Sequence, residues 1–182
     1  MVLGKVKELE DAKAELKALE SELSACYVKD KKRILDELKD QFSTFIESEG
    51  FSLVQSGNAL IGKYGATELK VEFPLPDDGF FGAVSVLDFS FNQKSNWKLT
   101  VLKGSADNAR FRMSTQILSN DELERTKNSI EELKKKLPYT PMQYCIMYYE
   151  QNSAIGGRGA NKEGPSVSTL TEALTDIVRQ LA

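Results

Sequence analysis

Histidine is absent from the 182 residues of this chain, and its absence removes much of the chemistry that a protein site can perform. Ser-His-Asp and Cys-His nucleophile pairs cannot form, nor can HExxH zinc sites or any histidine general base. Carboxylate, lysine, tyrosine or cysteine chemistry remains, but no spacing in the sequence gathers such residues into a catalytic set. We therefore expect a protein that is not an enzyme and that binds no metal or cofactor.

The two cysteines, the net charge and the hydropathy further narrow the class of protein. Cys26 and Cys145 lie in different segments and form no CxxC pair, so they cannot close a tetrahedral thiolate site. We expect reduced thiols in a cytoplasmic protein. No apolar stretch is long enough for a transmembrane helix, and the first residues lead into charges rather than a signal peptide. The net charge is −3 and no segment is strongly basic, which is unlike a typical nucleic-acid-binding protein.

The segment 154–168 is the most suggestive place for a ligand. It contains four glycines and two cations and leads into a predicted helix, and backbone amides at such a place can hold an anion. Its spacing matches neither GxxxxGK[ST] nor GxGxxG, so a surface loop is the competing interpretation. The residues of the predicted anion or nucleic-acid contact are Gly156, Gly157, Arg158, Gly159 and Lys162.

Two further groups of residues are candidate binding surfaces. Phe80 and Phe81 stand between glycines in a connecting segment, where they form a partner-binding tip or else fold inward to close the core. Lys98, Arg110 and Arg112 are expected on the solvent face of a sheet, where they contact a phosphate backbone or pair with acidic residues of neighbouring strands.

The elements that must position these groups begin with a long helix at 1–49. Helix breakers are almost absent there, and apolar residues recur at spacings of 3-4-3-4-3, which is typical of the a and d positions of a coiled coil. The pattern then slips by four residues and resumes as a wider stripe up to Ile46. Because such a helix needs a partner, we expect a homodimer, with folding back onto the chain's own globular part as the alternative. The predicted dimer interface is Leu9, Leu16, Leu19, Leu23 and Cys26, with Ala12 in the same row.

The rest of the chain, 50–182, predicts one globular α+β domain. Alternating apolar residues predict strands between 51 and 117, with hairpin turns at Ser56-Gly57-Asn58 and Gly65-Ala66. Ser119 and Glu122 form a capping-box pattern that predicts a helix at 120–137. A strand at 142–149 and a helix at 167–181 complete the prediction. The fold class is therefore an N-terminal coiled-coil helix followed by an antiparallel β-meander packed against helices.

This order of elements is similar to that of the dimeric coiled-coil proteins of kinetochores that carry RWD-like domains. The strand predicted at 142–149, between two helices, departs from that order. Because the resemblance is one of element order, it transfers no residue role to this chain.

These patterns favour a non-enzymatic interaction or adaptor protein, dimerised by its N-terminal helix and binding a partner protein through its α+β domain. The first alternative is a dimeric regulator that contacts nucleic acid through the cations of the glycine-rich segment and the sheet face. The second is a binder of a small anionic ligand, or an enzyme, that uses the 154–165 segment.

Overall fold

The computed structural model of the chain describes residues 2–75, 83–105, 121–151 and 165–181. The chain divides into two compact units, and each consists of two separate stretches of sequence. The helical unit comprises Met1–Asp30 and Arg112–Pro141, and the sheet unit comprises Lys31–Phe111 and Met142–Ala182. Helix α1, Val2–Ser48, runs without interruption through the boundary between them. No helix of the described residues has the length and apolarity needed to cross a membrane.

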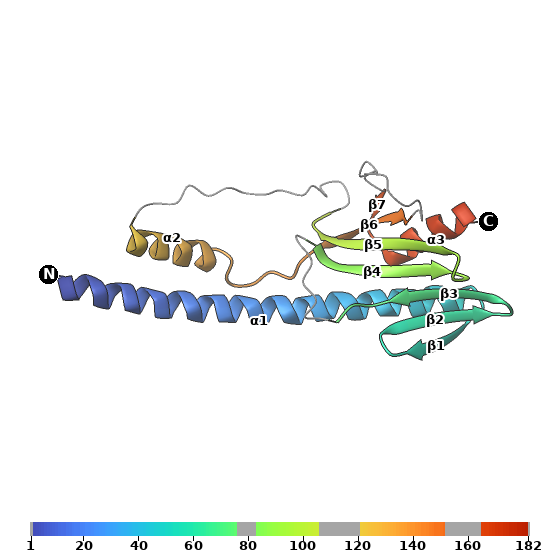
Figure 1. Cartoon of the computed structure of the whole chain (residues 1–182), viewed down its shortest axis with the longest axis horizontal. Helices are drawn as coiled ribbons and strands as arrows, with labels where there is room; N and C mark the ends of the chain where they lie inside the picture. Colours follow the sequence, from blue (N-terminus) through green and yellow to red (C-terminus); the bar gives the residue numbers. More distant parts are fainter. Residues whose placement is uncertain (1, 76–82, 106–120, 152–164, 182) are drawn as a thin grey trace. The chain divides into compact units, whose positions relative to one another are not determined.

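The sheet unit is built on a seven-stranded antiparallel sheet whose strands pair in the order of the sequence (Figure 1). Strand β6 pairs directly with β5, although helix α2 lies between them in the sequence. The chain is therefore of the α+β class, as predicted. The strands are β1 (Ser52–Ser56), β2 (Ala59–Tyr64), β3 (Thr67–Glu72), β4 (Ala83–Phe91), β5 (Ser95–Lys103), β6 (Tyr144–Glu150) and β7 (Ser166–Val167).

Glycines at defined turns set the register of the first three strands. Gly57 and Gly65 each occupy the first position of a two-residue hairpin turn, with φ of 58° and 57°, where a side chain would be strained. Both predicted turns are confirmed. In the β4–β5 turn, Asn92 and Gln93 adopt positive φ in succession, and Lys94 N donates to Phe91 O. Two successive residues of this kind match the twist of the flanking strands.

The core of the sheet unit lies between one face of the sheet and two helices. The second half of α1 contributes Ile34, Leu38, Phe42 and Ile46, all fully buried. Helix α3, Leu170–Leu181, contributes Leu174, Ile177 and neighbouring residues to the same cluster. The wider apolar stripe in the second half of α1 is thus buried in the sheet unit's core.

One glycine determines how closely α1 approaches the sheet. A Cβ built on Gly62 in β2 would lie 2.5 Å from Cδ1 and 2.9 Å from Cγ2 of Ile46. The absence of a side chain at this position therefore lets Ile46 pack directly on the strand backbone.

The C-terminal helix starts later than the predicted 167, because Ser166–Val167 forms the short strand β7. Thr169 is the residue before the helix, and its Oγ1 accepts from Glu172 N at 3.2 Å. Glu172 Oε2 in turn accepts from Ser168 N and Thr169 N, so the two side chains form a capping box. Gln41 of α1 adds a further cap, since its Oε1 accepts from Leu170 N at 2.7 Å.

Helix α2, Glu122–Lys134, lies within the predicted range, but its N-cap differs from the prediction. Asp121, not Ser119, caps the helix, and its carboxylate accepts from Leu123 N at 2.9 Å. Aspartate is as effective an N-cap as serine, so the capping-box pattern located the start two residues too early. The end of the region in which strands are predicted, from 106 to 117, lies outside the described residues.

Candidate helix-pairing interface

The row of apolar residues that predicts a coiled coil is the least exposed side of the first half of α1. Ala12 and Leu23 are buried, at 8% and 5% exposed, and the other members are half-buried. We call this row the leucine seam; its members are Leu9, Ala12, Leu16, Leu19, Leu23 and Cys26. Because these residues are already covered within one chain, the seam has a neighbour in its own unit.

Helix α2 and the turn after it carry a second row with the same spacing. Thr126 and Ile130 are buried, and Leu123, Leu133 and Leu137 are half-buried. The spacing along this row is 3-4-3-4, as in the leucine seam. In the sequence this spacing appears only when the polar Thr126 is counted as a member of the row. Thr126 can be buried there because its hydroxyl donates to Glu122 O at 2.8 Å.

Three ion pairs join the two helices and define their register. Lys127 Nζ lies 2.5 Å from Glu8 Oε1, and Lys134 Nζ lies 2.6 Å from Glu15 Oε1. Lys13 Nζ lies 3.0 Å from Glu122 Oε1, and this hydrogen bond is the main reason why the pKa of Lys13 is raised.

The sequence separations of these pairs show that α1 and α2 run in the same direction. The separation is 119 residues for Glu8–Lys127 and for Glu15–Lys134, and 109 for Lys13–Glu122. In a parallel helix pair, a residue at position g meets the residue at position e five places further along the partner. All three separations then agree with one offset of about 114, which sets Leu9 opposite Leu123 and Leu16 opposite Ile130.

A buried polar contact follows the apolar seam. Asp30 continues the seam by one further step and is 6% exposed. Tyr139 Oη donates to Asp30 Oδ2 at 2.7 Å, and the Tyr139 ring meets Tyr27 edge-on at 5.2 Å between centroids. Burial, and then the hydrogen bond to Asp30, raise the pKa of Tyr139 well above its usual value. A polar residue at a seam position is typical of helix pairs with one defined register.

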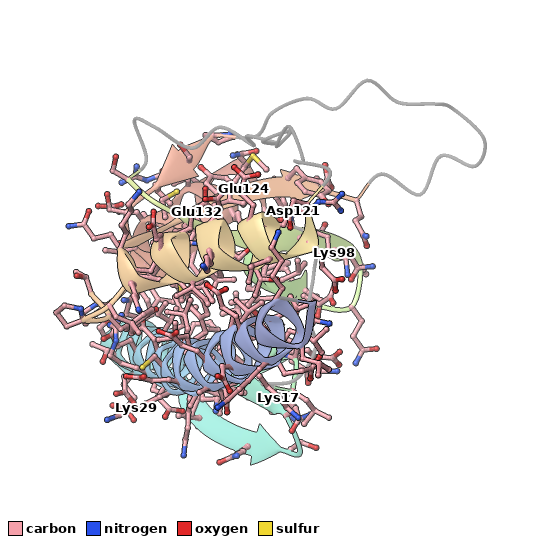
Figure 2. All side chains as sticks on the ribbon, turned by 90° about the vertical axis from the view of Figure 1, so that its left-hand side faces the viewer. Lys17, Lys29, Lys98, Asp121, Glu124 and Glu132 are labelled. Carbon is pink, nitrogen blue, oxygen red and sulfur yellow. The ribbon has the colours of Figure 1, made fainter. Side chains whose placement is uncertain are left out.

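The opposite face of α1 is exposed and partly apolar. Of the seven large apolar side chains exposed in the described chain, three lie on α1: Leu3 at 84%, Val6 at 52% and Val28 at 49%. At 100° per residue Leu3 and Val28 lie opposite the leucine seam, on the same side as the exposed Ala14, Ala18 and Ala25, whereas Val6 lies beside the seam in line with Lys13. We call Leu3, Ala14, Ala18, Ala25 and Val28 the outer face. Figure 2 shows Lys17 on this side of α1, and Glu124 and Glu132 on the side of α2 turned away from α1.

The five predicted interface residues Leu9, Leu16, Leu19, Leu23 and Cys26 thus share one face of α1. Most other predicted site residues lie outside the described residues. These are the aromatic pair Phe80 and Phe81, the strand cations Arg110 and Arg112, and the loop residues Gly156, Gly157, Arg158, Gly159 and Lys162.

The described cations on the solvent face of the sheet have acidic neighbours. Lys98 forms an ion pair with Asp88, its register partner on β4. Lys70 pairs with Glu72, and Lys63 Nζ lies 3.6 Å from Glu68 Oε2 on the neighbouring strand. For these three lysines, ion pairing within the sheet accounts for the pattern without a phosphate ligand.

The core of the sheet unit holds a buried tyrosine–carboxylate contact. Tyr148 on β6 is 1% exposed, and its Oη donates to Asp176 Oδ2 on α3 at 2.9 Å. Burial first, and then this hydrogen bond, raise the pKa of Tyr148 to about 12. The Trp97 ring lies 6.2 Å away between centroids. This contact links α3 to the sheet, and the raised pKa of Tyr148 makes its effect on stability measurable as a function of pH.

No family model, curated protein or solved structure matches this chain.

Proposed function

We propose that this protein is a non-enzymatic interaction protein whose first helix pairs on two opposite faces. The leucine seam forms a parallel coiled coil with α2, and the outer face holds a second copy of the chain. Each dimer then carries two copies of the α+β domain and so offers two equivalent surfaces to a partner protein. Two linked copies bind a partner with higher avidity than one, without any new contact.

The observation that carries this proposal is the distribution of apolar residues around α1. A helix that serves only to pair with α2 needs one apolar stripe. Here the leucine seam is buried or half-buried within one chain, whereas Leu3 and Val28, on the other side, are 84% and 49% exposed. Small side chains between them allow a second helix to approach closely, as at other helix contacts where alanine replaces larger residues.

The dimer is tested by light scattering of the wild-type chain at tens of micromolar. We expect twice the mass of one chain, and the Leu3→Glu/Val28→Glu variant should have the mass of one chain with unchanged helical circular dichroism. Val54→Glu in β1 is the matched control, since Val54 is 46% exposed and lies on no helix. A dimer that survives in the α1 variant places the interface elsewhere.

Partner binding by the α+β domain is tested with the aromatic pair Phe80 and Phe81, which the sequence singles out. We expect a Phe80→Ser/Phe81→Ser variant to lose a protein that the wild type retains from the native host. The variant must keep the wild-type urea midpoint, because aromatic residues that close the core would cost stability instead. A retained partner would show that it binds another surface.

A further inference from the structure

Of the two heptads that α2 spans, the charges that flank the leucine seam differ between the two helices at only one. At the matching positions of the first heptad, both helices have glutamate before and lysine after the seam residues. In the second heptad, α1 has two glutamates, where α2 has a serine and a lysine. The flanking residues are Glu8, Lys13, Glu15 and Glu20 in α1, and Glu122, Lys127, Ser129 and Lys134 in α2.

This difference gives the two possible helix pairs opposite electrostatics. In a parallel pair of two α1 helices, Glu15 of each copy meets Glu20 of the other, so two carboxylate pairs repel each other. In the α1–α2 pair, Glu15 meets Lys134 at 2.6 Å, and Glu20 is placed against the uncharged Ser129. The α1–α2 pair therefore keeps three attractive contacts and no repulsive one among these positions.

Repulsion in the wrong pair matters more here than attraction in the right one. The ion-paired side chains are about half exposed, and such pairs add little stability individually. Specificity, however, is the difference between two pairings, and carboxylates forced together penalise the competing one.

From this pattern we infer that the leucine seam of α1 selects α2 of its own chain and rejects a second α1. Ser129 and Lys134 are the specificity-determining residues. The inference rests on the coiled coil of the proposed function but not on the dimer, which uses the outer face. The inferred pairing differs from the homodimer that the sequence predicts. In that homodimer the second copy contacts Leu16 and Leu19, whereas here α2 of the same chain covers them.

Cysteine cross-linking tests which helix occupies the seam. Leu19 and Leu133 match at the offset of about 114. In a Cys26→Ser background, with oxidised glutathione as oxidant, Leu19→Cys/Leu133→Cys should form a disulfide within one chain. Leu19→Cys alone should give no linked dimer on a non-reducing gel. A linked dimer from either variant overturns the inference. The native mass, measured separately, tests the dimer of the proposed function.

A second pair of variants tests the two specificity residues. Ser129→Glu/Lys134→Glu gives α2 the flanks of α1, and we expect the rate of intrachain disulfide formation to fall roughly fivefold. Asn128→Glu/Lys135→Glu changes the net charge equally, at positions on the side of α2 away from the seam, and should leave the rate unchanged. Equal rates in the two variants overturn the assignment of Ser129 and Lys134.

Discussion

The Tyr148–Asp176 contact predicts a stability difference that changes with pH. Replacing Tyr148 with phenylalanine removes the donor to Asp176 Oδ2 and keeps the ring in the core. A hydrogen bond to a carboxylate contributes roughly 1.5–3 kcal/mol, so the variant should be less stable than the wild type by about that amount at pH 7.

Above pH 10 this advantage of the wild type should shrink. The pKa of Tyr148 is about 12 in the folded chain and 10.0 in the unfolded chain. Between these values the unfolded state releases a proton that the folded state keeps, so wild-type stability falls as the pH rises. The loss is about 1.4 kcal/mol per pH unit in this window, or roughly 1.4 kcal/mol at pH 11. The variant has no hydroxyl at this site and escapes that loss.

Urea unfolding at pH 8 and at pH 11 measures the difference. Trp97 is the only tryptophan of the chain and is 6% exposed, so its fluorescence reports unfolding of the sheet unit. Contributions of the groups that the two proteins share cancel when the two free energies are subtracted. The reasoning is refuted if wild type and variant differ by the same free energy at both pH values.

Three further substitutions test the packing and capping described above. Gly62→Ala should lower the free energy of unfolding by roughly 1–3 kcal/mol, because its Cβ would overlap Ile46, and adding Ile46→Val should restore part of the loss in the urea midpoint. Thr169→Ala should cost about 1 kcal/mol through the lost cap of α3, whereas Thr171→Ala, at an exposed position of the first turn, should change the midpoint little. Tyr139→Phe removes a donor from the buried Asp30 carboxylate and should destabilise the helical unit by roughly 1–3 kcal/mol, measured by far-ultraviolet circular dichroism; an unchanged melting curve would show that this contact contributes nothing.

Local patterns predicted most of the elements, because the signals lie within a few residues of one another. Glycines at Gly57 and Gly65 indicated two hairpins, and the absence of breakers between 5 and 49 indicated one helix. The start of α3 also has a local signal in the sequence, since Thr169 and Glu172 have the capping-box spacing. Ser166 and Ser168 are residues of a good N-cap type as well, and the predicted start at 167 falls between them, in the short strand β7.

Local periodicity does not identify α2 as the helix that packs against the leucine seam. The matching row lies about 114 residues away, and Thr126 interrupts its apolar pattern with a hydroxyl. The flanking charges contain the missing information, since Lys127 and Lys134 complement Glu8 and Glu15. A comparison of the e and g positions of all the helices that the sequence predicts therefore indicates α2 as the partner of α1.

Sedimentation equilibrium tests the two-faced pairing of α1 most directly. It compares the mass of the wild-type chain with that of the Leu19→Cys/Leu133→Cys disulfide form. In that form the leucine seam is locked to α2, so only the outer face of α1 can hold a second copy. We expect a dimer of the same affinity for both proteins. A locked form that is monomeric while the wild type is dimeric would show that the second copy binds the seam, and would contradict the proposed pairing.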